Sequence, residues 1–238
     1  MPTLDWFKGA SRKAIQLVAV SQPGSLIVEQ YRVLYTKIEN LKKQNHRKVF
    51  AITSAVKGEG KTTTSVNLGI VMARDFGQRV LLIEADLKLP TFHTFLGDPV
   101  LFGFDDLLRE DPQAERTAHP PALVSFAHDN LTLLPVSGKS RDAAPLFRPG
   151  RLEALLERLK TDYDYVLLDA PPVLPMADIN RIVHVVDGII FVVAAGLTPV
   201  SLVKRAISTL ETDQSKLAGT VLTRGDLMQS KYFHGYHS

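Results

Sequence analysis

Ala55-Val-Lys-Gly-Glu-Gly-Lys-Thr62 is a glycine-rich segment around which the rest of the chain is arranged. The apolar run 49–52 precedes it, and a pattern typical of a helix follows it over 62–76 and closes at Gly77. A glycine-rich loop between a strand and a helix is suited to phosphate, because backbone N–H groups and the positive end of the helix dipole both face the anion. The sequence therefore predicts a phosphate-binding loop here.

This loop matches the Walker A pattern, with Ala55 in place of the first glycine. Its glycines let the backbone turn its N–H groups toward the phosphates, Lys61 adds a positive charge near the β and γ groups, and the Thr62 hydroxyl is a ligand for Mg²⁺. A glycine-rich turn without a ligand would not need Lys-Thr at the start of a helix. The predicted nucleotide-binding residues are Val56, Lys57, Gly58, Glu59, Gly60, Lys61, Thr62 and Thr63.

Outward from the loop, predicted strands alternate with predicted helices. The strands are 49–53, 79–84, 131–134, 165–168, 189–193 and 220–222, and the helices are 25–41, 62–76, 103–109, 152–159 and 201–210. We interpret 42–48 as a polar turn, 111–129 as a variable surface excursion with three prolines, and the apolar run 182–197 as a buried strand. This alternation predicts an α/β fold, a mostly parallel sheet with helices on both faces, which binds ligands at the carboxyl ends of its strands.

Two of the predicted strands end in carboxylates. Glu84 and Asp86 follow the second strand, and Asp169 ends the fourth. Because side chains alternate along a strand, Glu84 and Asp86 point to the same side. Carboxylates that face phosphate and Mg²⁺ hold metal-bound water or accept a proton from an attacking hydroxyl, although each acid taken singly is equally typical of a turn or helix cap. We predict Lys61, Asp86 and Glu84 as catalytic residues, and Thr62, Asp86 and Asp169 as metal ligands.

Composition excludes several other classes of protein. A chain of 238 residues with 45% hydrophobic and 22% charged residues is ordinary for one globular domain. The net charge of +3 gives no reason to expect nucleic acid as a partner, and the lack of cysteine excludes disulfides, thiolate catalysis and iron–sulfur clusters. Neither a signal peptide over 1–24 nor a membrane-spanning apolar run is evident, so we expect a cytoplasmic protein.

Three motifs together resemble the bacterial tyrosine kinases of capsular and exopolysaccharide biosynthesis. They are Lys61-Thr62, Glu84-x-Asp86-x-Lys88 and Asp169-Ala-Pro-Pro172, the last a Walker B arrangement. These kinases belong to the deviant-Walker group that includes the MinD and ParA ATPases, so the resemblance implies a MinD-like (SIMIBI) P-loop NTPase that uses ATP and Mg²⁺. The family's second motif usually reads Asp-x-Asp followed by arginine, so Glu84 and Lys88 depart from it, and lysine lacks the guanidinium fork.

The resemblance also implies an oligomer and a phosphorylated tail. In that family Glu-x-x-Arg-x-x-Arg on the first helix helps to build a ring of subunits, and here Glu29 and Arg32 match while Tyr35 takes the last position. The family's tyrosine-rich tail is phosphorylated by neighbouring subunits, which assigns Tyr232 and Tyr236 as acceptors here. A tail that merely packs its aromatic residues on the surface is the alternative.

These assignments divide the chain into three parts. Residues 1–24 form an N-terminal arm that is a candidate for docking on an adaptor or a membrane, 25–225 the ATPase and kinase domain, and 226–238 a mobile tail. The resemblance implies a stand-alone kinase that works at the inner face of the cell membrane through a polysaccharide co-polymerase or adaptor. A homo-oligomer and a phosphotyrosine phosphatase are the other partners that we expect.

Two alternatives use the same loop differently. A MinD- or ParA-like switch would dimerise with ATP and separate on hydrolysis, but its additional lysine, five positions before Lys61, is replaced here by Val56, with Lys57 one step later. A kinase-like scaffold would bind ATP and control a membrane partner without phosphate transfer. The short tyrosine tail and the departure at Glu84 are both compatible with such a scaffold, so it stays an alternative.

Overall fold

The computed structural model describes residues 15–96, 100–110, 123–138, 145–148, 150–176, 178–210 and 214–225. Within these ranges lies one sheet of seven strands in the order β3-β4-β2-β5-β1-β6-β7. The strands are β1 (Val49–Ser54), β2 (Val80–Glu84), β3 (Val124–Phe126), β4 (His128–Leu134), β5 (Tyr165–Asp169), β6 (Gly188–Ala194) and β7 (Leu217–Thr223). Neighbouring strands are parallel except β3 and β4, which confirms the predicted mostly parallel sheet.

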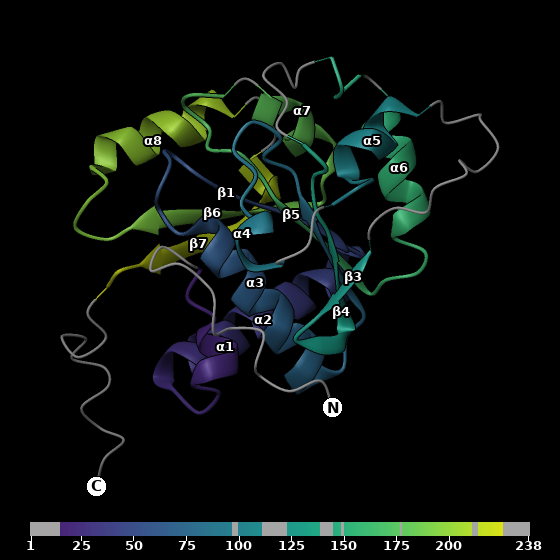
Figure 1. Cartoon of the computed structure of the whole chain (residues 1–238). Helices are drawn as coiled ribbons and strands as arrows, with labels where there is room; N and C mark the ends of the chain where they lie inside the picture. Colours follow the sequence, from purple (N-terminus) through teal and green to yellow (C-terminus); the bar gives the residue numbers. More distant parts are fainter. Residues whose placement is uncertain are drawn as a thin grey trace, which may run out of the picture.

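Helices cover both faces of this sheet (Figure 1). They are α1 (Val18–Ser21), α2 (Leu26–Asn45), α3 (Lys61–Phe76), α4 (His93–Leu96), α5 (Phe104–Arg109), α6 (Arg151–Leu159), α7 (Asp178–Val185), α8 (Val200–Thr209) and the short 3₁₀ helix η2 (Gln214–Lys216). One hydrophobic core lies under α5 to α8, and the other under α1 to α4. The two cores follow from the alternation of side chains along each strand.

Strand β1 illustrates how the sequence builds these two cores. All six of its residues are buried, with Val49 and Ala51 in the core under α5 to α8 and Phe50 and Ile52 in the other. Such a doubly buried, largely apolar strand is typical of the centre of a parallel sheet. Its neighbour β6 begins at Gly188, where a Cβ would lie 2.7 Å from the Phe50 ring, so only glycine fits there.

Three expectations about the elements were wrong. The run 182–197 is a helix up to Val185 and a strand only from Gly188, because Asp187 interrupts it and accepts hydrogen bonds from the N–H groups of Lys48 and Val49, both at 2.8 Å. The excursion 111–129 contains β3 and the start of β4. The turn 42–48 is helical up to Asn45, and His46 ends α2 with a φ of 55°.

The described part of the predicted arm packs against α3. Asn67 accepts a hydrogen bond from the N–H of Ala19 at 2.8 Å and donates one to the carbonyl of Gln16 at 2.7 Å, and Ala19 is fully buried. Residues 1–14 and the tail 226–238 lie outside the described residues, so docking through the arm stays a prediction. No helix in the described part of the chain has both the length and the apolar character to cross a membrane.

Candidate functional site

The phosphate loop and both acidic strand ends meet at the carboxyl edge of the sheet. Strand β5 lies between β1 and β2, and Asp169 at its end is in register with Ile52 on one side and Glu84 on the other. Because these three strands are parallel, the segments that follow β1 and β2 leave the sheet beside Asp169. The topology therefore brings together the three motifs that the sequence holds far apart.

The phosphate loop has the backbone that its glycines predict. Gly58 and Gly60 adopt φ values of 87° and 94°, in the left-handed region where other residues are strained. Lys61 is the first residue of α3 and is buried, with 8% of its surface exposed, whereas Lys57 is exposed. Lys61 thus holds its charge at the helix N-terminus, where an anion is favoured.

Asp169 lies against two hydroxyl groups of α3. Its Oδ2 accepts a hydrogen bond from Thr62 Oγ1 at 2.6 Å, and its Oδ1 accepts one from Ser65 Oγ at 3.1 Å. Burial raises the pKa of Asp169 to about 6, against the lowering effect of the Lys61 charge and the two hydroxyls. Sequence reasoning missed Ser65, although its position one helical turn after Thr62 was a usable signal.

Asp86 is the second buried acid that faces the Lys61 charge. Its Oδ1 accepts a hydrogen bond from the N–H of Leu89 at 3.1 Å, and 9% of its surface is exposed. Burial raises the pKa of Asp86 above its usual value, while that hydrogen bond and the charge of Lys61 act in the opposite direction. Lys88 stands where the family has arginine. Its Nζ forms an ion pair with Asp178 Oδ2 at the start of α7, at 2.8 Å.

The Glu84 carboxylate accepts hydrogen bonds from the backbone of two loops. One carboxylate oxygen accepts hydrogen bonds from the N–H groups of Thr91 and Phe92, and the other accepts one from Val136 at 3.0 Å. Glu84 is 1% exposed, and burial raises its pKa to about 7. Its carboxylate thus holds the loop that carries Asp86, which makes Asp86 the better placed of the two acids for chemistry.

The three predicted metal ligands lie at this edge, and their role as ligands stays a prediction. Thr62, Asp86 and Asp169 supply one hydroxyl and two carboxylates, which are hard donors of the kind that this ion prefers. The described residues contain no group of three or more His, Asp or Glu side chains able to enclose a metal by themselves. Mg²⁺ typically takes one or two carboxylates and completes its shell with water and substrate phosphates, and its binding at these residues stays a prediction.

Val56 and Glu59 of the predicted nucleotide-binding set face each other within the loop. The N–H of Val56 donates to Glu59 Oε2 at 2.8 Å, and the Val56 carbonyl accepts a hydrogen bond from Ser54 Oγ at 2.7 Å. The carbonyl of Thr63 accepts a hydrogen bond from Asn67 at 2.8 Å. These groups shape the loop, and the assignment of the whole set to nucleotide binding stays a prediction.

The two raised pKa values predict how pH changes stability. The values of about 7 for Glu84 and about 6 for Asp169 exceed their ordinary values of 4.5 and 3.8, so the folded chain binds protons more tightly than the unfolded chain. The free energy of unfolding without nucleotide should therefore fall as pH rises from about 4 to about 7. Thermal melts between pH 5 and pH 8 test this, and Glu84→Gln should flatten the upper part of the profile. A melting temperature that rises throughout this range would contradict the assignment.

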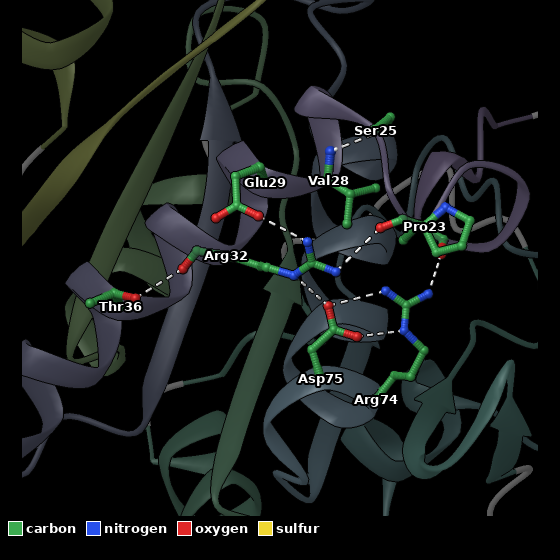
Figure 2. A network of polar contacts seen from close by, with 9 residues as sticks. Pro23, Ser25, Val28, Glu29, Arg32, Thr36, Arg74 and Asp75 are labelled. Atoms are coloured by element: carbon green, nitrogen blue, oxygen red, sulfur yellow. Dashed lines mark hydrogen bonds and ion pairs between the residues drawn. The ribbon is translucent and has the colours of Figure 1, made fainter. Parts of the chain in front are cut away.

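Glu29 and Arg32, predicted for ring assembly, belong to an ion-pair network within the chain (Figure 2). The Arg32 guanidinium donates to Glu29 and Asp75, both at 2.9 Å, and to the carbonyl of Pro23 at 3.2 Å. Asp75 also accepts two hydrogen bonds from Arg74. Arg32 therefore ties the start of α2 to the end of α3, and its role between subunits stays a prediction.

Tyr35, at the position of the family's last arginine, is a core residue. It is 2% exposed, and its ring lies 4.1 Å from that of Phe76 and 6.0 Å from that of Tyr165. The substitution thus replaces a charged side chain with a buried aromatic one, and it leaves Glu29 and Arg32 as the polar part of the motif.

Arg32→Ala should lower the free energy of unfolding by about 1–3 kcal/mol, because Asp75 and the Pro23 carbonyl lose a charged donor. Lys43→Ala is the matched control on the same helix. Its ion pair with Glu39, at 3.2 Å, is exposed and should contribute about 0.5 kcal/mol or less. Urea unfolding of both variants gives the comparison, and equal losses would show that the Arg32 network adds nothing beyond an ordinary surface pair.

Comparisons with known proteins agree with this geometry. Residues 50–231 match the family described as the CobQ/CobB/MinD/ParA nucleotide binding domain. The chain is 34% identical to the tyrosine-protein kinase YwqD of Bacillus subtilis (strain 168) over 229 residues, which cover 95% of this chain and 93% of YwqD. Among solved structures, the BceF tyrosine kinase domain superimposes with a TM-score of 0.74 at 28% identity, over 87% of this chain and 81% of that one.

A longer relative matches through one part of its length. The chain is 26% identical to the succinoglycan biosynthesis transport protein ExoP of Rhizobium meliloti (strain 1021), over 92% of this chain but 29% of ExoP. This chain therefore corresponds to less than a third of that transport protein. The family match and the match to YwqD together cover most of the sequence, and the chain belongs to the CobQ/CobB/MinD/ParA nucleotide-binding family and, within it, to the bacterial tyrosine-protein kinases.

Proposed function

We propose that this chain transfers the γ-phosphoryl group of ATP to tyrosine hydroxyls. We propose further that the acceptors include Tyr232 and Tyr236 of neighbouring copies of the same chain. The observation that carries the proposal is the meeting of Lys61, the Thr62–Asp169 pair and the buried Asp86 at one edge of the sheet. A cation, a hydroxyl–carboxylate pair able to bind a metal and a further carboxylate near the phosphates are the parts that phosphoryl transfer requires.

Each of these residues has a role in the proposed reaction. Lys61 and the loop N–H groups stabilise the negative charge that develops on the transferred group. Thr62 and Asp169 would hold Mg²⁺, which neutralises phosphate charge when it is bound. Asp86 orients the tyrosine hydroxyl and accepts its proton, and its raised pKa makes it a better proton acceptor than an exposed aspartate.

We further propose that the kinase serves the synthesis or export of an exopolysaccharide together with a membrane co-polymerase. The match to ExoP, whose name refers to succinoglycan biosynthesis and transport, supports this setting. Each phosphate would add roughly −1.5 to −2 charges to the tail. Such charge on neighbouring subunits favours their separation, and a phosphotyrosine phosphatase would return the chain to the assembling form at the inner face of the membrane.

The test is to incubate the purified chain with ATP and Mg²⁺ and to map phosphotyrosine by mass spectrometry. The proposal predicts label at Tyr232 or Tyr236, and its loss in Tyr232→Phe/Tyr236→Phe. Tyr163→Phe, in the loop before β5, is the matched control and should keep the label. ATP-dependent dimers without label would instead support a switch, and ATP binding without dimers or label would support a scaffold.

A further inference from the structure

Glu59 is a buried carboxylate inside the phosphate loop. It is 2% exposed, and its two oxygens accept three hydrogen bonds: from the N–H of Val56 at 2.8 Å, from the N–H of Ala194 at 3.2 Å and from Thr198 Oγ1 at 2.6 Å. A negative charge beside a phosphate site is unfavourable, and burying it costs free energy unless donors compensate it. These three donors supply that compensation, and they join the loop to the end of β6 and to the segment that leads into α8.

The backbone of the same loop is held from the other side by the end of β7. The carbonyl of Glu59 accepts a hydrogen bond from Thr223 Oγ1 at 2.7 Å, and the carbonyl of Gly58 accepts one from Arg224 Nη2 at 3.1 Å. Thr223 also lies close under Gly60, where an added Cβ would be 3.2 Å from its methyl carbon. The loop is thus fixed both through a side chain and through two carbonyl groups.

These carbonyl contacts determine where the loop N–H groups point. In a trans peptide unit the C=O and the N–H of the next residue point in opposite directions, and the described residues contain no cis peptide bond. Because the carbonyls of Gly58 and Glu59 are turned toward the end of β7, the N–H groups of Glu59 and Gly60 are turned away from it. Glycine-rich loops bind phosphate through N–H groups that are left free in this manner.

We infer that Glu59, Thr198 and Thr223 are positioning residues that clamp the phosphate loop in its binding geometry before nucleotide arrives. We call these three residues the loop clamp. A loop that is already ordered loses less conformational entropy on binding, so the loop clamp strengthens nucleotide affinity without touching the nucleotide. The inference deepens the proposed function, since it rests on the loop being the site for the phosphates of ATP.

The test replaces hydroxyl groups by methyl groups of the same shape. Thr223→Val and Thr198→Val should each weaken the binding of ATP–Mg²⁺ by about five- to tenfold, the scale of one lost hydrogen bond. Thr223→Ser and Thr198→Ser, which keep the hydroxyl, should recover the lost affinity. Thr161→Val is the matched control, because Thr161 Oγ1 also donates to a carbonyl at 2.7 Å, on the exposed end of α6.

Calorimetric titration of the full chain with ATP–Mg²⁺ gives the affinities, and thermal melts without nucleotide separate binding from folding. The loop clamp predicts weaker binding in the valine variants, a fall of only a few degrees in melting temperature for the lost hydrogen bond, and rescue of both quantities by serine. Unchanged affinity in both valine variants would overturn it, and so would losses that serine fails to rescue. Because the readout is binding, an unmodified chain that binds ATP without forming phosphotyrosine would contradict the proposed function and leave the loop clamp standing.

Discussion

Lys61→Met should lower the rate of tyrosine phosphorylation by about 100- to 1000-fold, the range found when one preorganised electrostatic contact to a transition state is removed. Lys61 is buried at the N-terminus of α3, and its charge lowers the pKa of both Asp86 and Asp169 against the effect of burial. Methionine keeps the length and the apolar contacts of the side chain but removes the charge. We therefore expect the loss mainly in the rate of transfer, with a smaller loss of ATP affinity.

The matched comparison for Lys61 lies in the same loop. Lys57 is exposed, and Lys57→Met removes an identical charge only four residues away. Rates of phosphotyrosine formation at saturating ATP–Mg²⁺, measured for both variants, separate a specific role of Lys61 from a general effect of loop charge. If the two variants lost activity equally, Lys61 would have no special place in the proposed reaction.

Asp169→Asn should abolish the stimulation by Mg²⁺, with a loss of activity that again reaches about 100-fold or more. Asparagine retains a carbonyl oxygen that can accept the hydrogen bond from Thr62 or Ser65, but it carries no negative charge for a metal. Stability should move in the opposite direction. Because burial raises the pKa of Asp169 to about 6, the carboxylate is costly in the folded chain at neutral pH. The variant should therefore melt at the same or a higher temperature at pH 8.

Titration of phosphotyrosine formation with Mg²⁺, together with melting curves at pH 8 without nucleotide, tests both halves of this prediction. Asp162→Asn, at an exposed position before β5, is the control and should change neither quantity. An Asp169→Asn chain that keeps its Mg²⁺ response would remove Asp169 from the proposed metal site. One that unfolds would show that the carboxylate stabilises the folded chain, against the direction of its pKa shift.

The loop and the strands that lead to it were predictable from local pattern. The Walker residues, the buried strands on either side of Asp169 and the two helices after Ser25 and Gly60 each carry a short-range signal, either a periodicity or a glycine. The structure of the run 182–197 was not predictable, because apolar content alone does not distinguish a buried helix from a buried strand. Asp187, which divides the run, has its partners at the start of β1, far away in the sequence.

The site was predictable in its residue types but less so in their roles. Glu84 and Asp86 look equivalent in the sequence. Only the structure shows that the Glu84 carboxylate accepts hydrogen bonds from the N–H groups of Thr91, Phe92 and Val136. In the same way Glu59 has, besides Val56, partners on β6, before α8 and on β7, at separations of more than a hundred residues. Such contacts depend on the tertiary fold, which no local pattern encodes.

The central claim is that the edge formed by the phosphate loop, Asp86 and Asp169 transfers phosphate to tyrosine. Mass spectrometry of the full chain after incubation with ATP and Mg²⁺, beside Lys61→Met, tests it most directly. We expect phosphotyrosine in the unmodified chain, at Tyr232 or Tyr236, and its near-complete loss in the variant. An unmodified chain that binds ATP yet forms no phosphotyrosine, alone or with the cytoplasmic segment of a co-polymerase, would contradict it.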